Sequence, residues 1–90
     1  MPVSYVWKAK NDPCWDELVF RESGWHWWAT NPYSGAYGLP QSLPANKMAS
    51  MGADWRTSEE TQLKWMEQYV KNRYGTFCKA LRFQIAENYY

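Results

Sequence analysis

The stretch that decides the fold covers residues 12–24 and reads Asp12-Pro13-Cys14-Trp15-Asp16-Glu17-Leu18-Val19-Phe20-Arg21-Glu22-Ser23-Gly24. Asp as N-cap followed by Pro at the first helical position is typical of a helix start, and a glycine is typical of a helix end. At about 100° per residue, one face of this helix is apolar but also carries a carboxylate. That face consists of Trp15, Leu18, Val19 and Glu22. The sequence therefore predicts a helix that ends near Ser23, with Glu22 in its apolar stripe.

A carboxylate in an apolar stripe is costly unless it is paired with a cation or its pKa rises. A raised pKa would keep Glu22 protonated near neutral pH, as a general acid requires. The alternative is an ordinary glutamate near a helix end, whose side chain reaches water or caps a neighbouring group. Spacing alone leaves both interpretations open.

The rest of the chain predicts a small all-α domain with a loop-built groove. Further helices are expected over residues 45–51, after a capping box that begins at Thr57 and up to about Arg73, and over 77–86. Residues 25–44 form a long connection rich in Trp, Tyr, Asn, Pro, Ser and Gly, and a loop of that length is usually functional. Residues 1–11 have no clear period and are expected to form an extended N-terminal arm beside a domain over 12–90.

Length and charge exclude several classes of protein. Ninety residues make one domain, with a core that buries roughly 60% of the unfolded surface. Ten basic and nine acidic residues are interspersed, so nucleic acid is not an expected partner. No apolar run approaches the roughly 18 residues of a membrane span, and the start has no secretory h-region. The chain is expected either to be cut from a longer precursor or to leave the cell by another route.

The two cysteines, Cys14 and Cys78, stand 64 residues apart, which excludes a closely spaced zinc knuckle. With a single histidine in the chain, a Cys/His metal site is not expected, and no cofactor is implied. The thiols could be free in a reduced cytoplasmic protein, or they could form one disulfide between the first and last helices. Such a disulfide would stabilise the fold by about 4 kcal/mol in the chain-entropy model.

Five motifs occur in order along residues 14–90. They are Glu22-Ser23, the loop Gly35-Ala36-Tyr37-Gly38-Leu39-Pro40-Gln41, and the segments Lys47 to Ser50, Gly52 to Trp55 and Arg73 to Cys78. In this series the chain resembles the lysozyme-like lytic transglycosylases. In particular it is similar to the small actinobacterial and phage transglycosylase-like domains related to the resuscitation-promoting factors.

The resemblance implies the α-helical half of the lysozyme fold and cleavage of the β-1,4 bond between N-acetylmuramic acid and N-acetylglucosamine in peptidoglycan. Glu22 matches the family's catalytic glutamate, which would act as general acid and then as base on the muramyl C6 hydroxyl, giving a 1,6-anhydro product. Attack by water instead would make the chain a lysozyme-type muramidase. The resemblance also implies a Cys14–Cys78 disulfide, a place outside the cell or in its wall, and a monomer that binds the glycan strand.

The substrate-binding residues that this resemblance implies are Gln41, Asn31, Tyr37, Ser23 and Tyr90. For the first two residues the alternative is a local structural role: Gln41 would form hydrogen bonds with backbone groups of its loop, and Asn31 would form an Asx turn. Asp54 is a candidate second carboxylate, but a role in its turn is favoured. A non-catalytic glycan-binding module, or a structural domain of a phage or cell-surface protein, is the alternative class of function.

Three further expectations concern side chains outside these motifs. Some of the tryptophans that follow Glu22, namely Trp25, Trp27 and Trp28, are expected to pack against the helix and to keep the carboxyl partly dry, and the alternative is a surface cluster that binds glycan. The acidic residues of the 58–73 helix are expected to form a solvated face. His26 has no obvious partner and is expected to be exposed.

Overall fold

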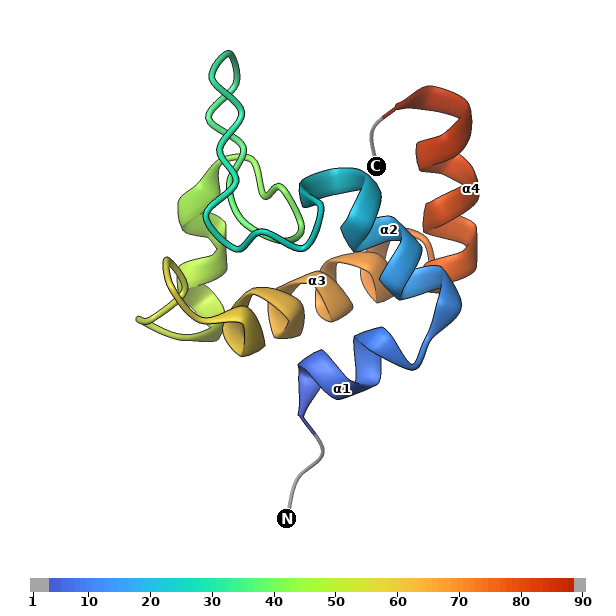
Figure 1. Cartoon of the computed structure of the whole chain (residues 1–90), viewed down its shortest axis with the longest axis horizontal. Helices are drawn as coiled ribbons and strands as arrows, with labels where there is room; N and C mark the ends of the chain where they lie inside the picture. Colours follow the sequence, from blue (N-terminus) through green and yellow to red (C-terminus); the bar gives the residue numbers. More distant parts are fainter. Residues whose placement is uncertain (1–3, 89–90) are drawn as a thin grey trace.

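The computed structural model describes residues 4–88, which form five helices. The longest of them, α3, lies at the centre of the arrangement (Figure 1). The helices are α1 (Tyr5–Lys10), α2 (Pro13–Ser23), the 3-10 helix η1 (Ala45–Met51), α3 (Glu59–Arg73) and α4 (Phe77–Glu87). Helices α1 and η1 pack against α3, while α2 packs mainly against α4. These residues contain isolated β-bridges but no β-strand, so the all-α prediction is confirmed.

Helix α2 has the bounds and caps that the sequence predicts. The Asp12 side chain accepts hydrogen bonds from the backbone N–H groups of Cys14 and Trp15, at 3.1 and 3.2 Å. At the other end, Gly24 adopts the left-handed conformation (φ +61°) and donates its N–H to a carbonyl in the last turn. The apolar stripe is buried as expected, because Trp15 stacks on Phe77 of α4 with ring centroids 4.2 Å apart.

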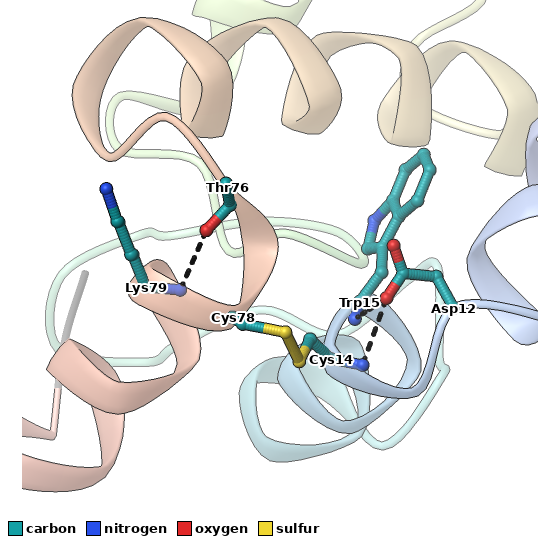
Figure 2. Close-up of a disulfide and its surroundings, with 6 residues drawn as sticks. All are labelled: Asp12, Cys14, Trp15, Thr76, Cys78 and Lys79. Carbon is teal, nitrogen blue, oxygen red and sulfur yellow. Dashed lines mark hydrogen bonds between the residues drawn. A yellow bond between two sulfur atoms is a disulfide. The ribbon is translucent and has the colours of Figure 1, made fainter.

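The two cysteines form a disulfide that joins the first turn of α2 to the first turn of α4 (Figure 2). This confirms the bonded alternative over two free thiols. Closing a loop of 64 residues is worth about 4 kcal/mol, a large share of the 5–15 kcal/mol that stabilises a typical domain. Both helix starts are also capped by side chains, by Asp12 in α2 and by Thr76 in α4.

Helix α3 is the centre of the core, and Leu63, Met66 and Val70 on its inner face are fully buried. Its N-cap is Ser58 rather than the predicted Thr57, since the Ser58 hydroxyl accepts from the N–H of the third helical residue. The Thr57 N–H is instead bonded to the Asp54 carbonyl, within the preceding turn. The N-cap was therefore predicted one residue early, and the predicted capping box is wrong, because Thr61 rather than Glu or Gln stands three residues after Ser58.

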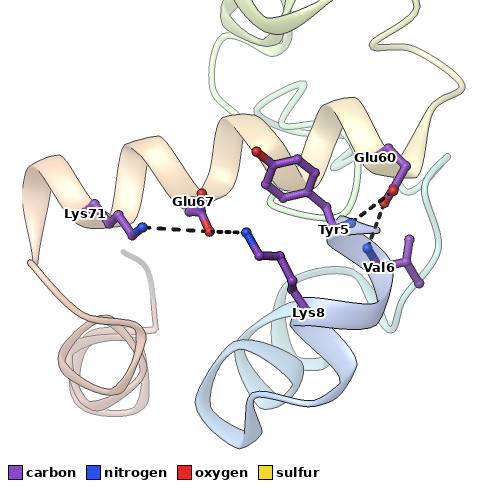
Figure 3. A network of polar contacts seen from close by, with 6 residues as sticks. All are labelled: Tyr5, Val6, Lys8, Glu60, Glu67 and Lys71. Carbon is purple, nitrogen blue, oxygen red and sulfur yellow. Dashed lines mark hydrogen bonds and ion pairs between the residues drawn. The ribbon is translucent and has the colours of Figure 1, made fainter. Parts of the chain in front are cut away.

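The prediction of an extended arm is wrong for the described part of residues 1–11, because Tyr5–Lys10 is helix α1. The Glu60 carboxylate of α3 accepts hydrogen bonds from the N–H groups of Tyr5 and Val6, at 3.0 and 2.7 Å (Figure 3). A helix start leaves such N–H groups without intrahelical partners, so this acid both caps α1 and holds it on α3. The face that carries Glu60 is therefore not simply solvated.

Ion pairs add to this contact between α1 and α3. The Glu67 carboxylate lies 3.8 Å from the Lys8 ammonium on α1 and 3.9 Å from the Lys71 ammonium on its own helix (Figure 3). Pairs this open to solvent contribute up to about 1 kcal/mol each, so α1 is held mainly by its cap and by the fully buried Ala9.

The long connection between α2 and η1 projects from the helices as a twisted hairpin (Figure 1). Two antiparallel bridges order it, one between Thr30 and Tyr37 and the other between Tyr37 and Ser42. The hairpin is fixed to α3 by Gln62, a fully buried side chain. Its Oε1 accepts from the N–H of Leu39 at 2.8 Å, and its Nε2 donates to the carbonyls of Trp27 and Trp55.

Close packing at this point requires a glycine. A Cβ added at Gly38 would lie 2.8 Å from the Gln62 Oε1, and the backbone there has φ +83°. A larger residue would therefore be strained and would also displace the amide that holds the hairpin.

Candidate active site

Glu22 lies in the last turn of α2 and forms part of the wall of a cleft of about 390 Å³. The other walls come from the hairpin, from the start of the segment that leads to η1, and from the residue that caps α4. The lining consists of Glu22, Asn31, Ser34, Ala36, Gln41, Leu43 and Asn88. Glu22 is the only side chain with an acidic or basic group among the described residues that line it.

The Glu22 carboxyl is partly buried, and its Oε1 atom is fully buried with no hydrogen-bond partner among the described residues. Burial raises the pKa of this carboxyl from 4.5 to about 7, because desolvation disfavours the charged form. Near neutral pH a substantial fraction of molecules therefore hold a proton at Glu22. A carboxyl group in this state can donate a proton to a bound oxygen and accept one back.

Gln41 lines the same cleft. Its Nε2 donates to the carbonyls of Ala29 and Gly38, both at 3.0 Å, while its backbone adopts φ +53°. The loop-bracing alternative is therefore present in the structure. The Gln41 Oε1 accepts no hydrogen bond from the described residues and remains available to a ligand, so the substrate contact stays a prediction.

Asn31 also lines the cleft and carries out the local role that was its alternative. Its Oδ1 accepts from the N–H groups of Tyr33 and Ser34, at 2.8 and 3.1 Å, which shapes the hairpin tip as an Asx turn. Its side chain is exposed, and its amide nitrogen donates to none of the described residues. The structure thus brings Glu22, Asn31 and Gln41 together around one cleft.

Two of the other predicted substrate residues, Tyr37 and Ser23, are not in the lining of this cleft. The Tyr37 hydroxyl donates to the Arg56 carbonyl at 2.6 Å, and its ring packs edge-to-face on Trp55. Ser23 turns its hydroxyl to the Val19 carbonyl within α2, at 3.1 Å. Tyr90 lies outside the described residues.

The tryptophans that follow Glu22 are not among the residues that line the cleft. Trp25 packs on α2, where its Nε1 donates to the Asp16 carboxylate at 2.7 Å, and Trp28 is 56% exposed. Trp27 packs against the core. The apolar residues of the cleft lining are Ala36 and Leu43. That indoles help to keep the carboxyl dry stays a prediction.

Two of the lining residues, Ser34 and Asn88, were not singled out by the sequence. Ser34 falls at the hairpin tip, and Asn88 is the left-handed C-cap of α4 (φ +64°), so both are typical turn residues with no distinct signal. Asp54 takes the turn role that was favoured, since its Oδ1 accepts from the Thr61 hydroxyl at 2.7 Å.

Within residues 4–88 no group of three or more His, Cys, Asp or Glu side chains is placed to hold a metal ion. In the same part of the chain, no helix has the length and apolarity needed to cross a membrane.

No protein-family model matches this chain, and neither does any curated protein or solved structure. The site must therefore be interpreted from its own chemistry.

Proposed function

We propose that this protein is a peptidoglycan-cleaving enzyme, a lytic transglycosylase in which Glu22 serves as general acid and then as general base. The observation that carries the proposal is the unpartnered, partly buried carboxyl with a pKa of about 7 in the wall of a cleft. Perturbed carboxyls in clefts are typical of catalytic acids. The lysozyme-like motifs around Glu22 and Gln41 supply the substrate class.

In the proposed reaction, the Glu22 carboxyl gives its proton to the glycosidic oxygen as the bond from that oxygen to the muramyl C1 breaks. The resulting carboxylate takes the proton of the muramyl C6 hydroxyl, and O6 bonds to C1 to close a 1,6-anhydro ring. Glu22 ends protonated, as it began, and no water is consumed. A pKa close to the working pH suits both the donation and the return of the proton.

The composition of the cleft lining supports a mechanism with one carboxylate. A hydrolase of the usual two-carboxylate type would place a second acid across the scissile bond. The described lining offers amides and a hydroxyl, from Asn31, Gln41, Ser34 and Asn88, rather than another acid. Such groups can donate hydrogen bonds to, and accept them from, the hydroxyl and acetamido groups of sugars.

The disulfide supports a place of action outside the cytoplasm. Disulfides persist in oxidising compartments and are rare among cytosolic proteins, where thiols are kept reduced. Peptidoglycan is itself extracytoplasmic, so the Cys14–Cys78 bond agrees with the proposed substrate.

The test compares the parent with Glu22→Gln in clearance of a suspension of purified peptidoglycan. Glu17→Gln is the matched control, because it makes the same change on the exposed side of α2, where Glu17 pairs with Arg21. We expect the Glu22 variant to lose activity by about 100-fold or more, as loss of a general acid does, and the control to keep it. Equal clearance by parent and Glu22 variant would refute the assignment.

Mass spectrometry of the released fragments then distinguishes the reaction types. Anhydro-muramyl ends, one water lighter than reducing ends, are expected for a transglycosylase. Reducing ends would instead indicate the lysozyme-type muramidase. Retention of the parent on peptidoglycan with no released fragments would favour a non-catalytic glycan-binding module.

A further inference from the structure

The cleft at Glu22 continues into two further cavities along α3. A cavity of about 210 Å³ shares Gln41 and Leu43 with the cleft. It shares four other residues with a larger cavity of about 640 Å³ between η1 and α3, namely Lys47, Trp65, Tyr69 and Arg73. The three cavities thus follow one another through common walls, and we refer to the two beyond the Glu22 cleft as the α3 groove.

The α3 groove has an aromatic wall. Trp65 and Tyr69, one turn apart on α3, stack with ring centroids 5.0 Å apart and planes inclined by 20°. The Arg73 guanidinium lies over the Tyr69 ring, 5.8 Å from its centroid. A guanidinium over an aromatic ring is attracted by the ring face, and its N–H groups can bind the oxygen atoms of a carboxylate.

The α3 groove also carries positive charge without a protein counter-charge. Neither Lys47 nor Arg73 forms an ion pair with any described residue, whereas Lys71 on the same helix pairs with Glu67. The two cations lie on different elements, η1 and α3, and face one groove. No acidic side chain is among the described residues that line either cavity. A ligand with carboxylate groups and an apolar body would complement this surface in charge and shape.

We propose that the α3 groove binds the carboxylate-bearing peptide stem of the peptidoglycan strand whose sugar bond is cleaved at Glu22. This inference rests on the proposed function, and it names the part of the substrate that would select it. The stem branches from the muramic acid next to the scissile bond, so a groove that continues from the cleft is where it would lie. Its carboxylates pair with Arg73 and Lys47, and its aliphatic side chains cover the Trp65–Tyr69 stack.

The test measures binding by the inactive Glu22→Gln protein to two preparations of peptidoglycan freed of teichoic acid. One preparation keeps its stems, and an amidase has removed the stems from the other. We expect binding to the intact strands to be about 10-fold tighter, the size expected for two solvent-exposed ion pairs. Adding Lys47→Gln and Arg73→Gln should abolish that difference and lower affinity only for the intact strands.

Lys64→Gln is the matched control, because Lys64 is also an exposed cation of α3 but lines a separate cavity beside α1. It should leave the preference for stems unchanged. Equal binding of both preparations, or an unchanged preference in the Lys47/Arg73 variant, would overturn the inference. Binding that appears only when teichoic acid is left on the wall would also overturn it, in favour of a phosphate-rich polymer.

Turnover by the protein with native Glu22 separates this inference from the proposed function. If the parent releases fragments from both preparations at the same rate, Glu22 chemistry stands and the stem site is wrong. If the parent releases none from either preparation, the proposed function itself fails.

Discussion

Replacing Glu22 with Gln should remove a pH dependence of stability that the buried carboxyl imposes. In the unfolded chain this carboxyl titrates near 4.5, and in the folded protein its pKa is about 7. Between these values the native state holds a proton that the unfolded state has lost, so the free energy of unfolding of the parent falls as pH rises. The stabilisation that the Glu22 proton gives the folded state is fully present below pH 4.5 and is lost above pH 7. The glutamine is neutral throughout and lacks this trend.

The size of the effect follows from the two pKa values. A rise from 4.5 to about 7 corresponds to roughly 3 kcal/mol for a group removed completely from water. Glu22 is only partly buried, so solvent screening reduces the expected change to about 1–2 kcal/mol. On a domain of this size that corresponds to several degrees in Tm.

Urea unfolding of both proteins at pH values below 4.5 and above 7 measures this change directly. We subtract the free energy of unfolding of the parent from that of the glutamine variant at each pH. This difference should be about 1–2 kcal/mol larger above pH 7 than below pH 4.5. Glu17→Gln controls for the amide substitution on the same helix, and the trend belongs to the cleft only if this variant fails to reproduce it. A constant difference between parent and Glu22 variant across the range would refute the argument that burial holds the proton.

Four further outcomes are expected. Activity on peptidoglycan should decline as pH rises through about 7, where Glu22 loses the proton it donates, and an assay that shows no such limb would contradict the role of acid. Cys14→Ala with Cys78→Ala should lower the unfolding free energy by about 4 kcal/mol in urea melts, and a loss below about 1 kcal/mol would contradict the loop-entropy account. Gln62→Leu leaves two buried backbone groups and one partly buried carbonyl unpaired and should cost about 3–5 kcal/mol, with faster amide exchange in the hairpin; exchange confined to α3 would count against its anchoring role. Glu60→Gln should cost about 1 kcal/mol and speed amide exchange in α1 alone, whereas a uniform increase over all helices would show that it does more than cap α1.

Features set by neighbours in the chain could be predicted from the sequence. The start and end of α2 depend on Asp12, Pro13 and Gly24, which act within a few residues of themselves. The N-terminal helix could not be predicted in this way. Its six residues lack a visible period. Ser4 caps it locally through the Trp7 N–H, but the Tyr5 and Val6 N–H groups are bonded by Glu60, which stands 55 and 54 positions away in the chain. Gln62 escaped notice for the same reason, since its three partners lie in separate segments.

The candidate site was predictable to a similar degree. Helical spacing predicted that Glu22 lies beside the core, and the resemblance predicted Gln41 and Asn31 as substrate-binding residues. The structure has all three in the lining of one cleft. Tyr37 could not be placed correctly, because an aromatic residue of a loop serves packing or binding equally well, and here Trp55 and the Arg56 carbonyl engage it. The identity of the wall around Glu22 depends on how the hairpin folds back, which no local pattern encodes.

The pairing of α2 with α4 has a mechanical consequence. Both helices start near the Cys14–Cys78 disulfide, and both contribute to the cleft at their other ends, α2 through Glu22 in its last turn and α4 through its C-cap Asn88. The disulfide holds the N-terminal ends of the two helices together, so the separation of their C-terminal ends at the cleft depends on the angle between the helix axes. A change in the size of a side chain between the helices, such as Trp15 or Phe77, would change that angle. The width of the cleft at Glu22 would therefore change, although the substituted residue lies at the opposite end of its helix.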